Sequence, residues 1–174
     1  MDMFAANPDV VSIRTQFGPL AFVLDRIEHK HYADLCVDFR NGARILYAVR
    51  AKANLGNLRK TLQHIRNQCL ELYAHEIHLL TEDEISKPKV YSSQQKVRSR
   101  NLRNEENNRH LLTVLKDLGG SAVIFDVFNH LEAKMTFADV WEAVWALLED
   151  GLIRHDHIDP DASFMTRLSK IRMA

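Results

Sequence analysis

Short apolar runs separated by turn residues dominate the first eighty residues of the chain. Asn41-Gly42 favours a tight hairpin turn, and Gly18-Pro19 and the polar stretch 28–31 also interrupt the apolar pattern. Four runs have the β-branched and aromatic composition of strands: 10–17, 20–27, 35–39 and 44–49. The pattern therefore predicts four strands, joined mostly by hairpins.

The spacing of the apolar positions changes after residue 55. They recur there every three or four residues, as on the buried face of a helix: Leu58, Leu62, Ile65, Cys69 and Leu72. The run 77–80 follows as a further short strand. Because a helix between two strands usually returns the chain to the same sheet, we expect an α/β domain with a mixed sheet.

The second half of the chain has the pattern of three helices followed by a small hairpin. Gly119-Gly120 suits the end of a helix, and Thr136 suits the start of one. The predicted helices and strands are 110–120, 122–134, 137–151, 152–156 and 164–172. This order is typical of a winged-helix domain.

Length and composition describe a globular protein. The chain has 174 residues, of which 46% are hydrophobic, and it lacks the roughly 20-residue apolar run of a membrane span. Its start, MDMFAANPDV, does not have the pattern of a secretory signal. Cys36 and Cys69 lie within apolar patterns. We therefore expect a cytoplasmic protein with buried free thiols and no membrane partner.

Charge is distributed unevenly, although the net charge is zero. The stretch 86–103 carries six basic residues and no acid: Lys87, Lys89, Lys96, Arg98, Arg100 and Arg103. Nine acids and three bases follow in 104–150. This switch predicts a basic linker at 86–103 between domains 1–85 and 104–174. The linker either follows a DNA backbone or is simply solvated.

One hairpin carries candidate metal chemistry. Asp34 opens one predicted strand, and Ala48 and Arg50 lie on the next, where residues two apart point to the same face. Magnesium-dependent cleavage of a phosphodiester needs oxygen ligands for the metal and a cation near the phosphate. By itself the pattern is weak, because an acid and a base often flank a hairpin by chance.

Neighbouring residues extend the pattern into a family resemblance. The segments VVSIRTQFGPL, Tyr32-Ala33-Asp34, NGARILYAV and HEIHLLTEDEI resemble the TnsA-type endonucleases, subunits of heteromeric transposases that nick the 5′ ends of the element. The resemblance implies a restriction-endonuclease-like mixed-sheet domain, followed by a winged helix. It also implies DNA and a transposase or transposition ATPase as partners, and it leaves an oligomer open.

The family's active site carries over only in part. Asp34 matches the metal-binding aspartate, but Ala48 stands where the family has Gln or Glu, and Arg50 stands where it has lysine. The family's N-terminal helix and its glutamate are also expected to be missing. We therefore expect no enzyme activity and no cofactor, with Mg²⁺ only if the protein is active. Asp38 or Lys52 could substitute, further along the strands.

This pattern favours an adaptor that binds DNA and a transposition protein without cutting. One alternative is an active Mg²⁺-dependent endonuclease that nicks transposon ends, with its site completed by another subunit. The other is a winged-helix DNA-binding regulator. The third predicted helix of the winged-helix domain argues against reading of the DNA sequence, because it has acids and no base: Asp139, Glu142, Glu149 and Asp150.

Three further groups of side chains each have two interpretations. Trp141 and Trp145 either form an exposed anchor for a partner or pack in the core. His29 and His31 either ligate a transition metal beside Asp34 or belong to a polar turn. The same choice, metal or acidic turn, applies to a group near the C-terminus: His155, Asp156, His157, Asp159 and Asp161.

Overall fold

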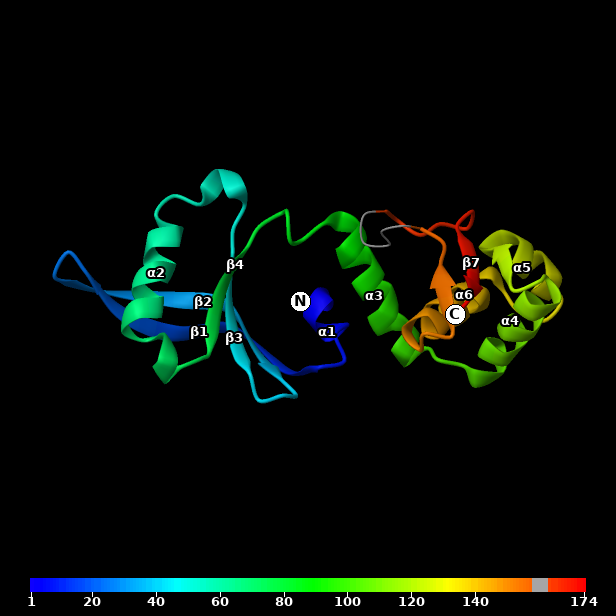
Figure 1. Cartoon of the computed structure of the whole chain (residues 1–174), viewed down its shortest axis with the longest axis horizontal. Helices are drawn as coiled ribbons and strands as arrows, with labels where there is room; N and C mark the ends of the chain where they lie inside the picture. Colours follow the sequence, from blue (N-terminus) through cyan, green and yellow to red (C-terminus); the bar gives the residue numbers. More distant parts are fainter. Residues whose placement is uncertain (158–162) are drawn as a thin grey trace. The chain divides into compact units, whose positions relative to one another are not determined.

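The computed structural model describes residues 1–157 and 163–174. The chain divides after Ser86 into two compact units, except that Asp2 groups with the second. Figure 1 shows the elements of both in sequence colours, and each unit is described by itself. None of the described helices has the length and apolarity needed to cross a bilayer.

The first unit is built on a four-stranded mixed sheet in the order β1-β2-β3-β4. The first three strands are antiparallel neighbours, and β4 is parallel to β3. Helix α2 connects β3 to β4, as the sequence predicts (Figure 1). The elements are α1 (Asp2–Ala5), β1 (Val10–Leu24), β2 (Ile27–Phe39), β3 (Arg44–Val49), α2 (Leu58–Gln68) and β4 (Glu76–Leu80).

The first two predicted strands are one long edge strand, β1. Pro19 does not end it, because proline is tolerated on an edge strand and the register shifts locally between Phe17 and Leu20. Gly18 is required there: its φ is +151°, and a Cβ would lie 2.8 Å from the His31 carbonyl oxygen. The stretch 28–31, predicted as a turn, lies instead within β2.

The turn between β1 and β2 is formed by Asp25 and Arg26. Both residues have positive φ values, 52° and 64°. Two consecutive residues of this kind form the tight turn that matches strand twist. The sequence prediction missed this turn because neither residue is a glycine.

Helix α2 packs its apolar stripe on the sheet. Leu62 and Ile65 are buried against Cys36 and Leu46 of the strands. Leu72 was predicted on the same stripe, but it is 79% exposed. The helix ends at Gln68 and a 3₁₀ turn, Leu70–Leu72, follows, so the helical spacing no longer applies.

Both cysteines are buried free thiols, as predicted. Cys36 lies in β2, and Cys69 follows α2. Burial raises the pKa of each thiol, so both are protonated at neutral pH. Neither thiol has the lowered pKa of a reactive cysteine.

The second unit contains helices and a three-stranded antiparallel sheet in the order β5-β7-β6. The three predicted helices and two C-terminal strands are present, and β5 adds a third strand. The elements are α3 (Lys87–Asn101), α4 (Glu105–Asp117), β5 (Ser121–Val123), α5 (Ile124–Leu131), α6 (Phe137–Glu149), β6 (Ile153–His155) and β7 (Lys170–Met173).

The segment predicted as a basic linker forms helix α3 instead. Pro88 is compatible with it, because proline is tolerated in the first turn of a helix. Asn104 then caps α4 through its side-chain oxygen, which accepts from the backbone N–H groups of Glu106 and Asn107. Polar composition suggested a linker, but α3 packs against α6 within this unit.

Helix α6 forms the centre of the second unit. Val140, Val144 and Leu147 are buried, as their spacing predicts. Thr136 caps the helix, and its backbone N–H donates to Asp139, which completes a capping box. Ala143, Trp145 and Ala146 are also buried, so α6 is covered on most of its circumference.

Candidate functional site

Asp34 lies in β2 beside the end of β3, as the sequence predicts. Its Oδ2 accepts a hydrogen bond of 2.7 Å from the Val49 backbone N–H and lies 3.7 Å from Arg50 Nη1. The Arg50 guanidinium also donates to the Val49 carbonyl oxygen at 2.8 Å. The carboxylate that would hold a metal is therefore bonded to the protein's own donors.

Ala48 follows Tyr47, which pairs with Leu35, and this register places Ala48 across from Asp34. Its side chain is 1% exposed and belongs to the apolar cluster around Leu62 and Ile65 of α2. A carboxylate at this position would be buried among hydrocarbon groups, which is costly without a partner. Position 48 therefore lacks both the ligand atom and the polar surroundings of a metal site.

His31 is the third group near Asp34. Burial lowers its pKa; the neighbouring Asp34 raises it, and Arg50 lowers it further. Its Nε2 is buried and has no hydrogen-bond partner among the residues the structure describes. The sequence places His31 near Asp34, but the polar turn expected there is part of β2, and this strand brings His31 close to both Asp34 and Arg50.

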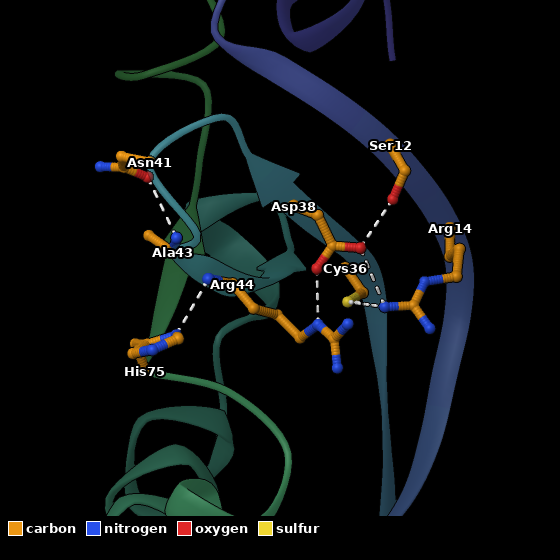
Figure 2. A network of polar contacts seen from close by, with 8 residues as sticks. All are labelled: Ser12, Arg14, Cys36, Asp38, Asn41, Ala43, Arg44 and His75. Carbon is orange, nitrogen blue, oxygen red and sulfur yellow. Dashed lines mark hydrogen bonds and ion pairs between the residues drawn. The ribbon is translucent and has the colours of Figure 1, made fainter.

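A second polar cluster centres on Asp38, at the opposite end of the β2–β3 pair (Figure 2). Its carboxylate accepts from Ser12 Oγ at 2.7 Å, Arg14 Nη2 at 3.2 Å and Arg44 Nε at 2.6 Å. The bonds from Arg44 and Ser12 hold the Asp38 pKa below its ordinary value. Arg14 also donates to Cys36 Sγ at 3.3 Å.

Asp38 and Lys52, the two residues that could substitute for the missing active-site groups, both have other partners. The Asp38 carboxylate is engaged by three donors, and Lys52 forms an ion pair with Asp83. Within the described part of the chain, no three His, Cys, Asp or Glu side chains are grouped as a metal site would require. Asp34 is thus the single matched ligand, and the side chains that surround it are a histidine and an arginine.

Two arginines of α3, and Arg103 after it, face acidic residues of α6 and its C-terminal end. Arg98 Nε lies 2.7 Å from Glu142, and Arg100 Nε donates to Glu149 at 2.8 Å. Further along, Arg103 Nη1 donates to Asp150 at 3.0 Å, and this guanidinium also pairs with Glu105. The charge switch in the sequence therefore reflects two complementary surfaces inside one unit.

This pairing changes the prediction for the six basic residues. Arg98, Arg100 and Arg103 neutralise acids of their own unit, whereas Lys87 and Lys96 have no ion pair within the described residues. Lys89 lies on the same helix. The helix therefore offers DNA much less net positive charge than the sequence suggests.

The two tryptophans of α6 have different environments. Trp145 is 4% exposed and packs in the core, which is the plainer of its two readings, so it is not an exposed anchor. Trp141 is partly buried, and its Nε1 donates to Gln95 Oε1 at 3.2 Å. It borders a groove of about 520 Å³, whose other apolar residues are Tyr91, Phe137, Ala138 and Met165.

The other candidate histidines are not grouped with two further possible ligands among residues 1–157 and 163–174. His155 and His157 stack with ring centroids 5.8 Å apart, and burial together with His157 lowers the pKa of His155. Asp159 and Asp161, which the same prediction included, lie outside the described residues. In the first unit, His29 stacks on Phe22 at 5.5 Å.

Comparison with known proteins does not identify a family for this chain. No protein-family model matches the chain, and no curated protein is significantly similar to it. The site is therefore interpreted from its own geometry.

Replacing Asp38 by Asn tests the first-unit cluster. Because the folded-state pKa lies below the ordinary 3.8, the carboxylate stabilises the unit above about pH 4 and loses this effect as pH falls further. We expect the substitution to lower the free energy of unfolding by about 1–2 kcal/mol at pH 6. The difference should shrink below about pH 4, as measured by hydrogen exchange of β2 amides. Asp25→Asn, in the exposed turn, is the control and should change little at either pH.

A double-mutant cycle tests the contact between α3 and α6. Arg100→Gln, Glu149→Gln and their combination should give a coupling of about 0.5–1 kcal/mol in urea unfolding followed by tryptophan fluorescence. The more exposed pair Arg172–Asp156, with an N···O distance of 3.6 Å, is the control and should show coupling near zero. Equal coupling in both pairs would contradict a structural role for the α3–α6 contact.

Proposed function

We propose that this chain is a TnsA-like accessory protein of DNA transposition, which binds DNA and a second transposition protein without cutting DNA. The main support for the loss of DNA cleavage is that Asp34 already has partners within the protein. Its carboxylate accepts from the Val49 N–H and lies 3.7 Å from Arg50 Nη1. A fixed guanidinium thus supplies the positive charge that a metal ion would bring.

The order of the elements in the first unit supports the nuclease-type ancestry. Three antiparallel strands are followed by a helix and a strand parallel to the third, and the candidate aspartate lies on the second strand. The burial of Ala48 supports the loss of chemistry, because two strands then offer a single ligand. One carboxylate binds Mg²⁺ poorly, since this ion usually needs several oxygen ligands.

Contact with DNA is assigned mainly to the first unit. Arg14 and Arg44 surround Asp38, so the cluster keeps one net positive charge, and their side chains are 45% and 39% exposed. Exposed guanidinium groups bind phosphate through several N–H donors. Lys87 of α3 is a further candidate, whereas Arg98 and Arg100 of α3 and Arg103 after it have acidic partners in their own unit.

The second unit suits a protein partner better than a DNA groove. A helix that reads bases must expose one face, but α6 is buried on most sides and its acids pair with α3. This disfavours a sequence-reading winged-helix regulator. The groove beside Trp141 is the proposed contact for the second transposition protein, because buried aromatic side chains often anchor such interfaces.

A plasmid-nicking assay in Mg²⁺ or Mn²⁺ tests the loss of cutting. We expect the wild-type protein to produce no more nicked circle than its Asp34→Ala variant. The Ala48→Glu/Arg50→Lys double variant should also remain inactive, since the new carboxylate would enter the apolar core. Nicking by the wild type that disappears in Asp34→Ala would replace our proposal with an active endonuclease.

The salt dependence of DNA binding tests the assignment of contacts. Replacing both Arg14 and Arg44 by Gln should reduce the slope of log K against log salt by about 2, because each lost phosphate contact removes about 0.9. The control variant Arg109→Gln/Lys116→Gln removes the same charge from the second unit and should leave the slope unchanged. Equal slopes for all three proteins, or no DNA binding, would contradict this assignment.

A further inference from the structure

The second unit contains a cavity that the proposed function does not use. Its volume is about 360 Å³, within the range of small-molecule sites. It is bounded by α3, α6, β6 and the segment before β7. The described residues that line it are Ser92, Lys96, Trp145, Leu148, Ile153, Arg154, His155, His157 and Met165.

Trp145 lines this cavity and has a buried indole N–H without a hydrogen-bond partner among the described residues. The residue is 4% exposed, and its ring is fixed edge-on against Tyr91 and Trp141, at centroid distances of 6.3 Å and 6.2 Å. Within the described chain its Nε1–H has no acceptor. A buried indole N–H normally has one, so an acceptor is missing at this position.

The polar lining of the cavity favours an anion. Lys96 and Arg154 are positively charged at neutral pH, and the described lining contains no Asp or Glu. Lys96 lies one helical turn after Ser92 on α3, so both border the cavity from the same helix. Lys96 is half-buried and has no ion pair within the described residues, so an anionic ligand would supply a counter-charge.

The remaining lining favours a hydrocarbon body. Leu148, Ile153 and Met165 contribute apolar side chains, and Ile153 and Met165 are among the buried core residues of the unit. Apolar walls with a few polar groups are typical of ligand sites in proteins. The ligand that matches both parts is small, apolar and singly negative.

We propose that this cavity binds a small apolar monocarboxylate. The carboxylate accepts from the Trp145 indole N–H and pairs with Lys96, while its hydrocarbon chain packs on Leu148, Ile153 and Met165. This assignment stands on the cavity alone and does not depend on a role in transposition.

Octanoate titrated into the full-length ¹⁵N-labelled protein tests the proposal directly. The indole N–H resonance of Trp145 should shift in a saturable manner, because it gains an acceptor. The resonance of Trp141 is an internal control, since this N–H already donates to Gln95. 1-Octanol, which has the same chain without the charge, should bind at least about tenfold more weakly.

Three variants separate the two contacts from general effects on folding. Lys96→Gln keeps the indole reporter and should weaken octanoate binding about tenfold while leaving octanol binding unchanged. Trp145→Phe keeps most of the ring volume and should cause a similar loss in calorimetry. Phe128→Leu, in α5 and outside the described cavity lining, should bind octanoate like the wild type.

Three results would overturn the proposal. The first is the absence of a saturable Trp145 shift up to the solubility limit of octanoate. The second is equal affinity for octanoate and octanol, which would show that the charge is not recognised. The third is an equal loss of binding in Phe128→Leu and Trp145→Phe, which would indicate a general packing effect.

Discussion

The packing of α3 against α6 determines most of what the second unit can do. Arg98, Arg100 and Arg103 meet three acids at α6 and its C-terminal end, so helix α6 becomes a core helix closed on most sides. Partly exposed ion pairs contribute little energy individually, but several in a row fix how two helices pair. This pairing occupies Glu142 and Glu149 of α6, and the same two helices border the cavity beside Trp145.

In the first unit, too, charged side chains are paired with partners from the same unit. Its two candidate carboxylates, Asp34 and Asp38, both accept from donors of the same sheet, and the nearest cations are arginines. A guanidinium is permanently charged and forms several directed bonds, so it can occupy the position of a counter-ion without binding a nucleophilic water. The arrangement stabilises the hairpin and leaves an electropositive surface around Arg14 and Arg44. Under the proposed function, this surface would bind DNA phosphates without cleaving them.

Much of the fold could be predicted from the sequence, because the period of the apolar residues reports local structure. The return of the chain from β3 through α2 to β4, the stripe of α6 and its cap at Thr136 are confirmed. The predictions are wrong where a local sequence signal conflicts with the pairing of strands or helices in the folded unit. Gly18-Pro19 favours an end to β1, yet an edge strand tolerates it. The polar composition of 86–103 favours a linker, but the segment forms α3, whose Arg98 and Arg100 pair with acids of α6.

The sequence by itself determined the identities that limit the chemistry: Asp34 without a second acid, and Arg50 in place of a lysine. Only the tertiary structure decided what surrounds them, because contacts between residues far apart in the chain leave no trace in local spacing. It placed Ala48 in the apolar core, Trp145 beside a cavity, and the basic residues of α3 against the acids of α6. Burial and charge pairing depend on which surfaces meet, and that is settled when the whole chain packs.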